Sequence, residues 1–358
     1  QSDAAFALRL RREVVVWRAR LDRALARFLR QPPGSLDRRT LEVLRLGAVQ
    51  ILVLGTPAHA AVSETVGLAG NPGARKLVNA VLRRLSAEGE EDDLPLHVRW
   101  SHPEELVRRW IGRRGSEETE RLLRWNNEPP PLGGFAFGPP PDGEPGLYLE
   151  DYRILRRGTP LPPPGVFLQD EAAAVVARAF RAVPGGTALE VCAAPGGKTA
   201  HQGGCLTVCM DSSVGRMRRW LENRERFRWN FALPLVGDGR FPPLRGGFDK
   251  VFLDVPCTNT GVLRRRPGAR WAWSLEALMR VSKLQGELLE RASRLVAPGG
   301  VVFYSTCSLE PEENRERVRS FEAAHPEFDR FPLKVPPQLE REGMMVSEPP
   351  DSGVDGMF

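Results

Sequence analysis

The chain has 358 residues, of which 41% are hydrophobic and 27% charged, and its formal net charge is +6. It is too long for one small hydrophobic core, so we expect two or three domains. The excess of positive charge favours a polyanionic partner such as RNA. Because we find no stretch of about 18 apolar residues and no signal peptide, we expect no membrane insertion.

The N-terminal quarter has helical periodicity. Its predicted helices cover 13–29, a segment after the proline-glycine break at 31–34, 62–69 and 74–85. Ser35 or Asp37 is the predicted cap of the second helix. We therefore predict a small all-helical domain over residues 1–88. Its arginine-rich outer faces fit either a solvated surface or RNA contacts.

The next part of the chain is mixed in character. An acidic, polar stretch at 86–93 predicts a linker, and Ser101 is a candidate cap for a helix that follows it. Another helix is predicted over 116–125, and the proline- and glycine-rich stretch 129–145 predicts loops between short strands. We assign residues 89–165 to a linker and a small α+β middle domain that binds RNA.

Strand and helix signals alternate in the rest of the chain. The predicted strands are 188–193, 206–211, 233–237, 249–255 and 300–306, and the predicted helices are 172–180, 214–228 and 274–296. Near-continuous apolar strands alternating with helices indicate a parallel sheet covered on both faces. Residues 166–358 are therefore predicted to form an α/β, Rossmann-like domain.

Polar or reactive groups follow each predicted strand. In chain order they are the glycine turn 191–199, Asp211, Asp238, Asp254 with Cys257, and Cys307. Ligands of an open parallel sheet bind beyond the carboxyl ends of its strands, so we expect these groups to meet at one edge. Each aspartate alone could be an ordinary turn former, and each cysteine alone a small buried hydrophobe.

The glycine turn ends in Gly-Lys-Thr, as a phosphate-binding loop does. That loop also requires a glycine at the position of Cys192, and the three spaced glycines of a dinucleotide site are missing. The small residues of the turn instead suit S-adenosylmethionine, whose carboxylate turn amides can meet. Asp211 is placed to bind ribose hydroxyls, and Asp238 to accept from the adenine amino group.

The five cysteines do not have the spacings of a zinc site, and no metal is expected. Cys205 and Cys209 lie in one strand-like run without a histidine or another cysteine nearby to complete a site. We expect free thiols in a reducing cytoplasm. Two of these thiols beside a carboxylate and a nucleotide-type turn indicate covalent attack on a pyrimidine ring followed by methyl transfer.

Several segments together resemble RNA (cytosine-5)-methyltransferases of the RsmB/Sun/Nop2 family, also called Fmu-type. They are 192–199, 237–240, 254–262 with Pro267 and Trp271, 304–308 and 311–314. The N-terminal segments 46–50, 57–64 and 77–83 resemble the NusB-like domain of the bacterial RsmB branch. The resemblance implies a class I S-adenosylmethionine-dependent methyltransferase that modifies C5 of a cytosine in 16S ribosomal RNA.

The resemblance also implies individual roles. Cys307 is the thiolate that attacks C6 of the cytosine, Cys257 assists product release, and Asp254 hydrogen-bonds N3 or the exocyclic amine of the ring. Lys198 borders the cofactor turn and faces the target base, which must be unstacked to enter such a pocket. The implied cofactor-binding residues are Cys192, Ala193, Ala194, Pro195, Gly196, Gly197, Lys198, Asp211, Arg216, Asp238 and Asp254.

Some alternatives stay open at this point. DNA cytosine-5 methyltransferases attack with a Pro-Cys thiol, so Cys257 is a rival nucleophile. The substrate could be tRNA or DNA, and the chain could be a NusB-like adaptor with an inactive methyltransferase fold. Our expectation is a monomeric cytoplasmic enzyme acting on unassembled or partly assembled 16S ribosomal RNA.

The sequence departs from the family pattern at two places, and two histidines lie away from the candidate site. Only residues 200–204 separate the glycine turn from the next strand, so either the crossover is abbreviated or the chain lacks residues here. The stretch 131–135 lacks the Arg-x-Asn that the family often shows, which puts one RNA contact in doubt. His59 and His102 lie in turns of the helical region, away from the candidate site, and are interpreted as structural.

Overall fold

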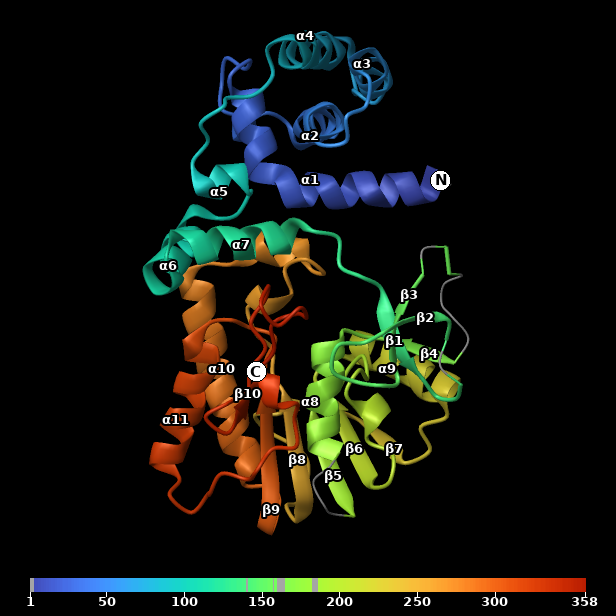
Figure 1. Ribbon diagram of the computed structural model, residues 1–358, viewed down its shortest axis with the longest axis vertical. Coiled ribbons are helices and arrows are strands. Elements are labelled where there is room, and N and C mark those ends of the chain that lie inside the picture. The colour runs from blue at the N-terminus through green and yellow to red at the C-terminus, as the bar shows by residue number, and fades with distance from the viewer. Residues whose placement is uncertain (1–2, 140, 157, 160–164, 182–185) are drawn as a thin grey trace. The chain divides into compact units, whose positions relative to one another are not determined.

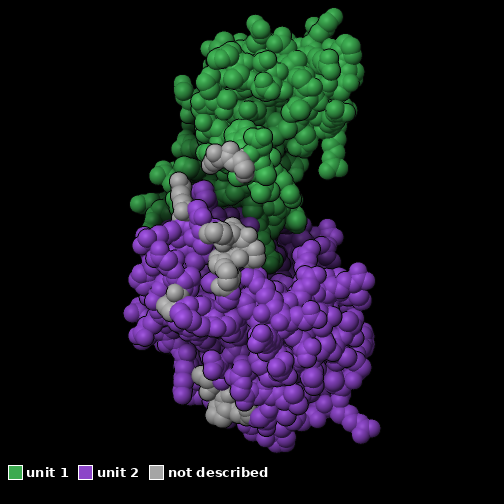
Figure 2. All heavy atoms as spheres, turned by 90° about the vertical axis from the view of Figure 1, so that its right-hand side faces the viewer, with its two compact units in different colours: residues 1–128, 266–272 green, residues 129–265, 273–358 purple. Residues whose placement is uncertain are grey.

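The computed structural model describes residues 3–139, 141–156, 158–159, 165–181 and 186–358. The chain divides into two compact units, residues 1–128 with 266–272 and residues 129–265 with 273–358 (Figure 2). The predicted middle part, 89–165, is thus shared between the units. Our finer division at 88 and 165 stays a prediction.

The first unit is helical, as the sequence predicts. Its helices are α1 (Asp3–Ala26), α2 (Arg38–Leu52), α3 (Ala58–Gly67), α4 (Pro72–Glu88), α5 (Leu96–Arg99), α6 (Glu104–Arg114) and α7 (Ser116–Asn127). Asp37 is the cap of α2, since its carboxylate accepts from the Thr40 amide at 3.0 Å. Ser35 belongs instead to the short 3-10 helix Pro33–Ser35.

The core of the first unit lies among α1 to α4. Leu21, Leu25, Leu44, Val49 and Leu82 are fully buried there. The predicted helix 13–29 is ten residues too short at its start, because α1 begins at Asp3. Residues 4–9 are exposed, so the burial pattern that marks the rest of α1 is missing from this end.

A second sequence segment completes this unit. The 3-10 helix Pro267–Ala272 belongs to it, although its flanking residues belong to the other unit. The fully buried Arg270 donates to the Asn127 Oδ1 at 2.7 Å and to the carbonyls of Ser101 and Asn126 at 3.1 Å. The Trp271 indole donates to the Val15 carbonyl of α1 at 2.7 Å.

The prediction that Ser101 caps a helix is wrong. The helix begins at Glu104, with Pro103 at the cap position. Ser101 has a φ of 54°, and its hydroxyl accepts from the Ala19 amide of α1 at 3.0 Å. Next to it His102 is buried, and burial holds the pKa of its imidazole well below the usual value. These surroundings fit a structural histidine, whereas His59 is exposed in α3.

The second unit is built on a parallel sheet. Its strands are β5 (Thr187–Val191), β6 (Leu206–Asp211), β7 (Ala232–Val236), β8 (Phe248–Asp254) and β9 (Val296–Ser305). They run in the order β7-β6-β5-β8-β9, as Figure 1 shows. The order reverses between β5 and β8, which is where an open α/β sheet forms its ligand crevice. The Rossmann-like fold predicted from the sequence is confirmed.

Helices cover both faces of this sheet. Successive strand residues point to opposite faces, so each strand contributes apolar side chains to both layers of helices. On one face, Ala188, Phe252 and Phe303 pack with buried residues of α8 (Glu171–Arg181). On the other, Leu189, Val191, Val251 and Leu253 pack with α10 (Leu275–Ser293). The remaining helices of the unit are α9 (Val214–Phe227) and α11 (Arg315–Ala324).

The crossover between β5 and β6 is short. It contains one three-residue 3-10 helix, Thr199–His201, yet the two strands pair in parallel from Thr187 opposite Leu206 to Val191 opposite Met210. The connection between these two parallel strands therefore lacks the α-helix of a usual crossover.

A small antiparallel sheet also belongs to the second unit. Its order is β2-β3-β1-β4, and its strands are β1 (Gly133–Ala136), β2 (Gly143–Pro145), β3 (Tyr152–Leu155) and β4 (Val166–Leu168). A further hairpin joins β10 (Glu340–Arg341) to β11 (Met344–Met345).

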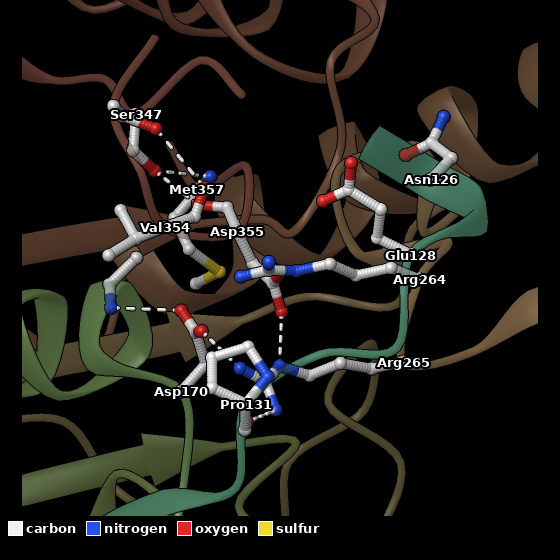
Figure 3. A network of polar contacts seen from close by, with 12 residues as sticks. Asn126, Glu128, Pro131, Asp170, Arg264, Arg265, Ser347, Val354, Asp355 and Met357 are labelled. Carbon is white, nitrogen blue, oxygen red and sulfur yellow. Dashed lines mark hydrogen bonds and ion pairs between the residues drawn. The ribbon is translucent and has the colours of Figure 1, made fainter. Parts of the chain in front are cut away.

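A network of charged side chains ties the segment after β4 to two later segments of the second unit. Arg265 donates to Asp170 at 2.7 Å and to Asp355 at 2.5 Å, and Arg264 donates to the other oxygen of Asp355 at 2.5 Å (Figure 3). Asp355 is fully buried. Arg264 and Arg265 lie midway along the connection between β8 and α10 that also carries Cys257, so the network holds the middle of this connection to the body of the unit.

Candidate active site

The glycine turn follows β5 and has a tightly determined backbone. Cys192 has a φ of 62° and Gly196 a φ of 104°. A Cβ atom on Gly196 would lie 2.6 Å from the Trp229 ring, so only glycine fits this position. The Gly197 carbonyl accepts from Gln169 Nε2 at 2.9 Å, and Asn223 donates to the Pro195 carbonyl at 3.0 Å.

A buried acid is hydrogen-bonded to the last residue of the glycine turn. Glu190, in β5, accepts a hydrogen bond of 2.6 Å from the Thr199 hydroxyl, which in turn accepts from the Trp220 indole at 3.0 Å. Burial raises the pKa of Glu190 to about 8. Thr199 directly follows Lys198, so this chain of bonds fixes the end of the turn that carries the lysine.

Two aspartates predicted to bind the cofactor lie at neighbouring strand ends. Asp211 ends β6 and is 2% exposed. Its Oδ1 accepts from Ser213 at 2.8 Å and Arg216 at 2.7 Å, while Oδ2 accepts one long bond of 3.4 Å from the Ala194 amide. Oδ2 therefore has capacity for a ligand hydroxyl.

Asp238 follows β7 and is half-buried. Arg240 donates to both of its carboxylate oxygens, and this hydrogen-bonding lowers the pKa of Asp238. The acid therefore stays a hydrogen-bond acceptor, as its predicted contact with an amino group requires. Small residues in the turn and acids after the next two strands fit an aminoacyl nucleoside such as S-adenosylmethionine.

Lys198 and Asp254 form an ion pair at the edge where β5 and β8 adjoin. Their side chains are 13% and 27% exposed. The other Asp254 oxygen accepts from the Ser305 hydroxyl at 3.1 Å. Burial alone would lower the pKa of the Lys198 ammonium, but the charges of Asp254 and Cys307 outweigh it, so this pKa is raised and the lysine is charged.

The two predicted cysteines meet at the ends of β8 and β9. The Sγ atoms of Cys257 and Cys307 are 3.1 Å apart, and both side chains are half-buried and free of disulfides. The hydrogen bond with Cys307 and burial together raise the pKa of the Cys257 thiol. Burial raises the pKa of Cys192 to about 12, so that thiol is a poor nucleophile.

Sequence reasoning missed three residues beside these thiols. Asn259 has a φ of 61°; its Oδ1 accepts from Cys307 Sγ at 3.4 Å and its Nδ2 donates to the Cys257 carbonyl at 2.8 Å. Thr258 and Ser308, the residues after the two cysteines, both donate to Glu313. All three lie inside motifs that the sequence analysis quotes, so their position next to the cysteines was the available signal.

Among the described residues, none of the helices is long and apolar enough to cross a membrane. In the same part of the chain, no group of three or more histidine, cysteine, aspartate or glutamate side chains could hold a metal ion.

A Rossmann-like sheet with this turn and these acids at its carboxyl edge defines an S-adenosylmethionine-dependent methyltransferase. Residues 177–358 match the family described as 16S rRNA methyltransferase RsmB/F, and residues 1–87 match the NusB family. The chain therefore belongs to the RsmB/F family of methyltransferases, its cofactor is S-adenosylmethionine, and its N-terminal region is NusB-like.

Curated relatives match most of the chain. Ribosomal RNA small subunit methyltransferase B of Pseudomonas putida is 30% identical, with 96% of this chain and 86% of the relative covered. The Thermus thermophilus protein of the same name is 34% identical, with 94% and 83% covered.

Solved structures share the fold. The crystal structure of PH0851 has a TM-score of 0.84 and 25% identity, covering 98% of this chain and 88% of that one. A methyltransferase homolog from Pyrococcus horikoshii has a TM-score of 0.59 at 22% identity and covers 73% and 95%.

Proposed function

We propose that this enzyme methylates C5 of a cytosine in 16S ribosomal RNA through a covalent adduct between Cys307 and C6. The observation that carries the proposal is the pair of thiols 3.1 Å apart at the ends of two neighbouring strands, beside the Lys198–Asp254 ion pair. A direct methyl transfer needs no thiol, whereas addition to the ring and later elimination need one nucleophilic thiol and gain from a second group that assists release. The family and its curated relatives point to small-subunit ribosomal RNA as the substrate.

Cytosine C5 is a poor nucleophile until a thiolate adds to C6 and makes the ring enamine-like. Asp254 then hydrogen-bonds N3 or the exocyclic amine, which stabilises the charge on the ring. S-adenosylmethionine, when bound, supplies an electrophilic methyl group. Loss of the C5 proton and expulsion of the Cys307 thiolate restore the aromatic ring, and Cys257 assists this release.

The electrostatics favour Cys307 over Cys257 as the nucleophile. The charged Lys198 interacts with Cys307, and this interaction contributes to the raised pKa of the lysine. An ammonium group near a thiol stabilises the thiolate. The hydrogen bond with Cys307, burial and the Glu313 charge all raise the pKa of the Cys257 thiol. A thiol that stays neutral can donate its proton to the departing Cys307 sulfur, which lies 3.1 Å away.

Trapping on RNA that contains 5-fluorocytosine tests this order, because fluorine at C5 prevents the final elimination. We expect Cys307→Ala to abolish the covalent protein–RNA adduct and Cys257→Ala to retain it. Denaturing gel electrophoresis with labelled RNA measures the adduct. The reverse pattern would show that Cys257 is the nucleophile and would overturn our assignment.

The substrate requires a separate measurement. We expect a monomeric cytoplasmic enzyme that transfers the methyl group of labelled S-adenosylmethionine to unassembled or partly assembled 16S ribosomal RNA. Transfer RNA, DNA and complete small subunits are the matched alternatives, and bisulfite sequencing locates the modified cytosine. Methyl incorporation into transfer RNA or DNA alone would overturn the proposed substrate. No methyl incorporation into any nucleic acid would favour an RNA-binding adaptor.

A further inference from the structure

One carboxylate lies between the two segments that carry the cysteines. Glu313 is fully buried in the 3-10 helix Pro311–Glu313. Its Oε1 accepts from the Thr258 amide at 2.8 Å and from Gln285 Nε2 at 2.9 Å. Its Oε2 accepts from the hydroxyls of both Thr258 and Ser308. The Glu313 bridge, formed by Glu313, Thr258 and Ser308, therefore joins the residue after Cys257 to the residue after Cys307.

Asn314, the residue after Glu313, is hydrogen-bonded to both sequence neighbours of Cys307. Asn314 Oδ1 accepts from the Thr306 hydroxyl at 2.5 Å, and its Nδ2 donates to the Ser308 carbonyl at 2.7 Å. Cys307 is thus bracketed by two anchored neighbours. Cys257 is held through Thr258 and through the carbonyl of Pro256, which accepts from Gln285 at 2.9 Å.

The helix that carries Glu313 is itself anchored. The Tyr304 hydroxyl, from β9, donates to the Glu313 carbonyl at 2.6 Å, and the Ser282 hydroxyl, from α10, donates to the Glu312 carbonyl at 2.8 Å. The carboxylate is therefore a fixed point to which both cysteine segments are bonded, rather than a side chain that follows their movements.

We propose that Glu313 is a positioning residue that sets the separation of the two thiols, and so keeps Cys257 within reach of the adduct on Cys307. Its effect on catalysis rests on the function proposed above, whereas its effect on the thiols does not. If the bridge is removed, Cys307 still adds to the ring, since Lys198 and Asp254 are untouched. Release slows, because the second thiol is no longer held beside the first.

Disulfide formation between the two cysteines measures their alignment without any RNA. Hydrogen peroxide takes one hydrogen from each thiol, the S–S bond forms, and the peroxide is reduced to two waters. We expect Glu313→Ala to slow this reaction about tenfold or more, because small misplacements cost large factors in rate. Glu313→Gln should stay near the wild-type rate, since its amide can accept from Thr258 N and donate to the two hydroxyls.

Glu316→Ala is the matched control, because Glu316 is an exposed acid in the same segment. Mass spectrometry of the peptides that contain Cys257 and Cys307 follows the reaction, and circular dichroism checks the fold. If Glu313→Ala does not fold, Thr258→Val removes one hydroxyl of the bridge and should slow the reaction in the same direction. A wild-type rate in a folded Glu313→Ala variant, or in Thr258→Val, would overturn the proposal.

The second readout is the RNA adduct formed with unmodified cytosine. We expect Glu313→Ala to accumulate a methylated covalent adduct, as Cys257→Ala should, with little change in the rate at which the adduct forms. A variant damaged only in its fold would instead form the adduct slowly. If the wild type methylates no RNA, the proposed function fails, while the disulfide measurement still decides whether Glu313 positions the thiols.

Discussion

At the scale of single residues, Glu190 shows how a buried acid can make stability depend on pH. It is 1% exposed, and it accepts from the Thr199 hydroxyl at 2.6 Å and from the Cys209 thiol at 3.9 Å. Burial raises its pKa from the ordinary 4.5 to about 8, so the folded chain keeps a proton that the unfolded chain loses. The stabilisation that this proton gives is complete below the unfolded-state pKa and is lost as pH rises through the folded-state pKa.

We therefore predict that Glu190→Gln flattens the pH dependence of stability between pH 4.5 and about 8. In the wild type, Glu190 should lower the free energy of unfolding by at most about 1.4 kcal/mol for each pH unit in this window. Denaturant titrations at several pH values measure it, with Glu316→Gln as the exposed control. Parallel profiles for the wild type and Glu190→Gln would mean that Glu190 is ionised in the folded chain.

The residues of the site differ in how well sequence predicted them. Asp254, Cys257 and Cys307 were found because each follows an apolar run, and the ends of parallel strands meet in space. Glu313 and Gln285 were not assigned, because they act through hydrogen bonds to residues 28 to 55 positions away in the sequence. No local pattern predicts which of many glutamates will be buried at such a junction.

At the scale of elements, the short crossover between β5 and β6 depends on two glycines in different situations. Both have positive φ, 104° at Gly196 and 109° at Gly204. A Cβ atom on Gly196 would lie 2.6 Å from Trp229, whereas one on Gly204 would meet nothing within 4 Å. A substitution at Gly204 therefore tests backbone strain alone, whereas one at Gly196 tests the same strain together with a steric clash.

We predict that Gly204→Ala destabilises the protein by about 1–2 kcal/mol, the cost of a side chain in this backbone region. Gly196→Ala should cost about 1–3 kcal/mol more, because it also displaces the buried Trp229. It should weaken S-adenosylmethionine binding as well, since the turn must shift. Thermal unfolding and isothermal titration calorimetry measure the two effects. Equal losses at both positions would show that Trp229 gives way without cost.

The elements themselves were largely predictable. The five parallel strands were found from continuous apolar runs, and α2 from its apolar residues after a cap at Ser35 or Asp37, of which the structure shows Asp37. The start of α1 was missed because residues 4–9 bury little, and the helix after Ser101 was placed too early because Ser101 bonds to α1 instead. The two errors have different causes: the start of α1 lacks a burial pattern, whereas at Ser101 a contact distant in sequence overrode the local signal.

At the scale of the whole molecule, the chain passes between its two units three times. The 3-10 helix Pro267–Ala272 bonds to α1 and α7, although it lies more than 130 residues beyond α7 in the sequence. Arg270 supplies bonds to Ser101, Asn126 and Asn127 that residues 1–128 cannot replace. Sequence could not predict this, because the segment carries a methyltransferase motif and no helical pattern.

We predict that Arg270→Met destabilises the first unit in particular. The substitution fills similar space but leaves two buried carbonyls and the Asn127 oxygen without their charged donor, and hydrogen bonds to charged groups contribute about 1.5–3 kcal/mol each. Hydrogen exchange should therefore rise in α1 and α7 and stay unchanged in β5 and β8. Arg270→Lys should give an intermediate loss, because an ammonium keeps the charge without the planar fork. Arg280→Met, at a largely exposed arginine, is the control. A uniform rise in exchange across both units would mean that they unfold as one cooperative body, and that the segment 266–272 stabilises the whole chain rather than the helices it contacts.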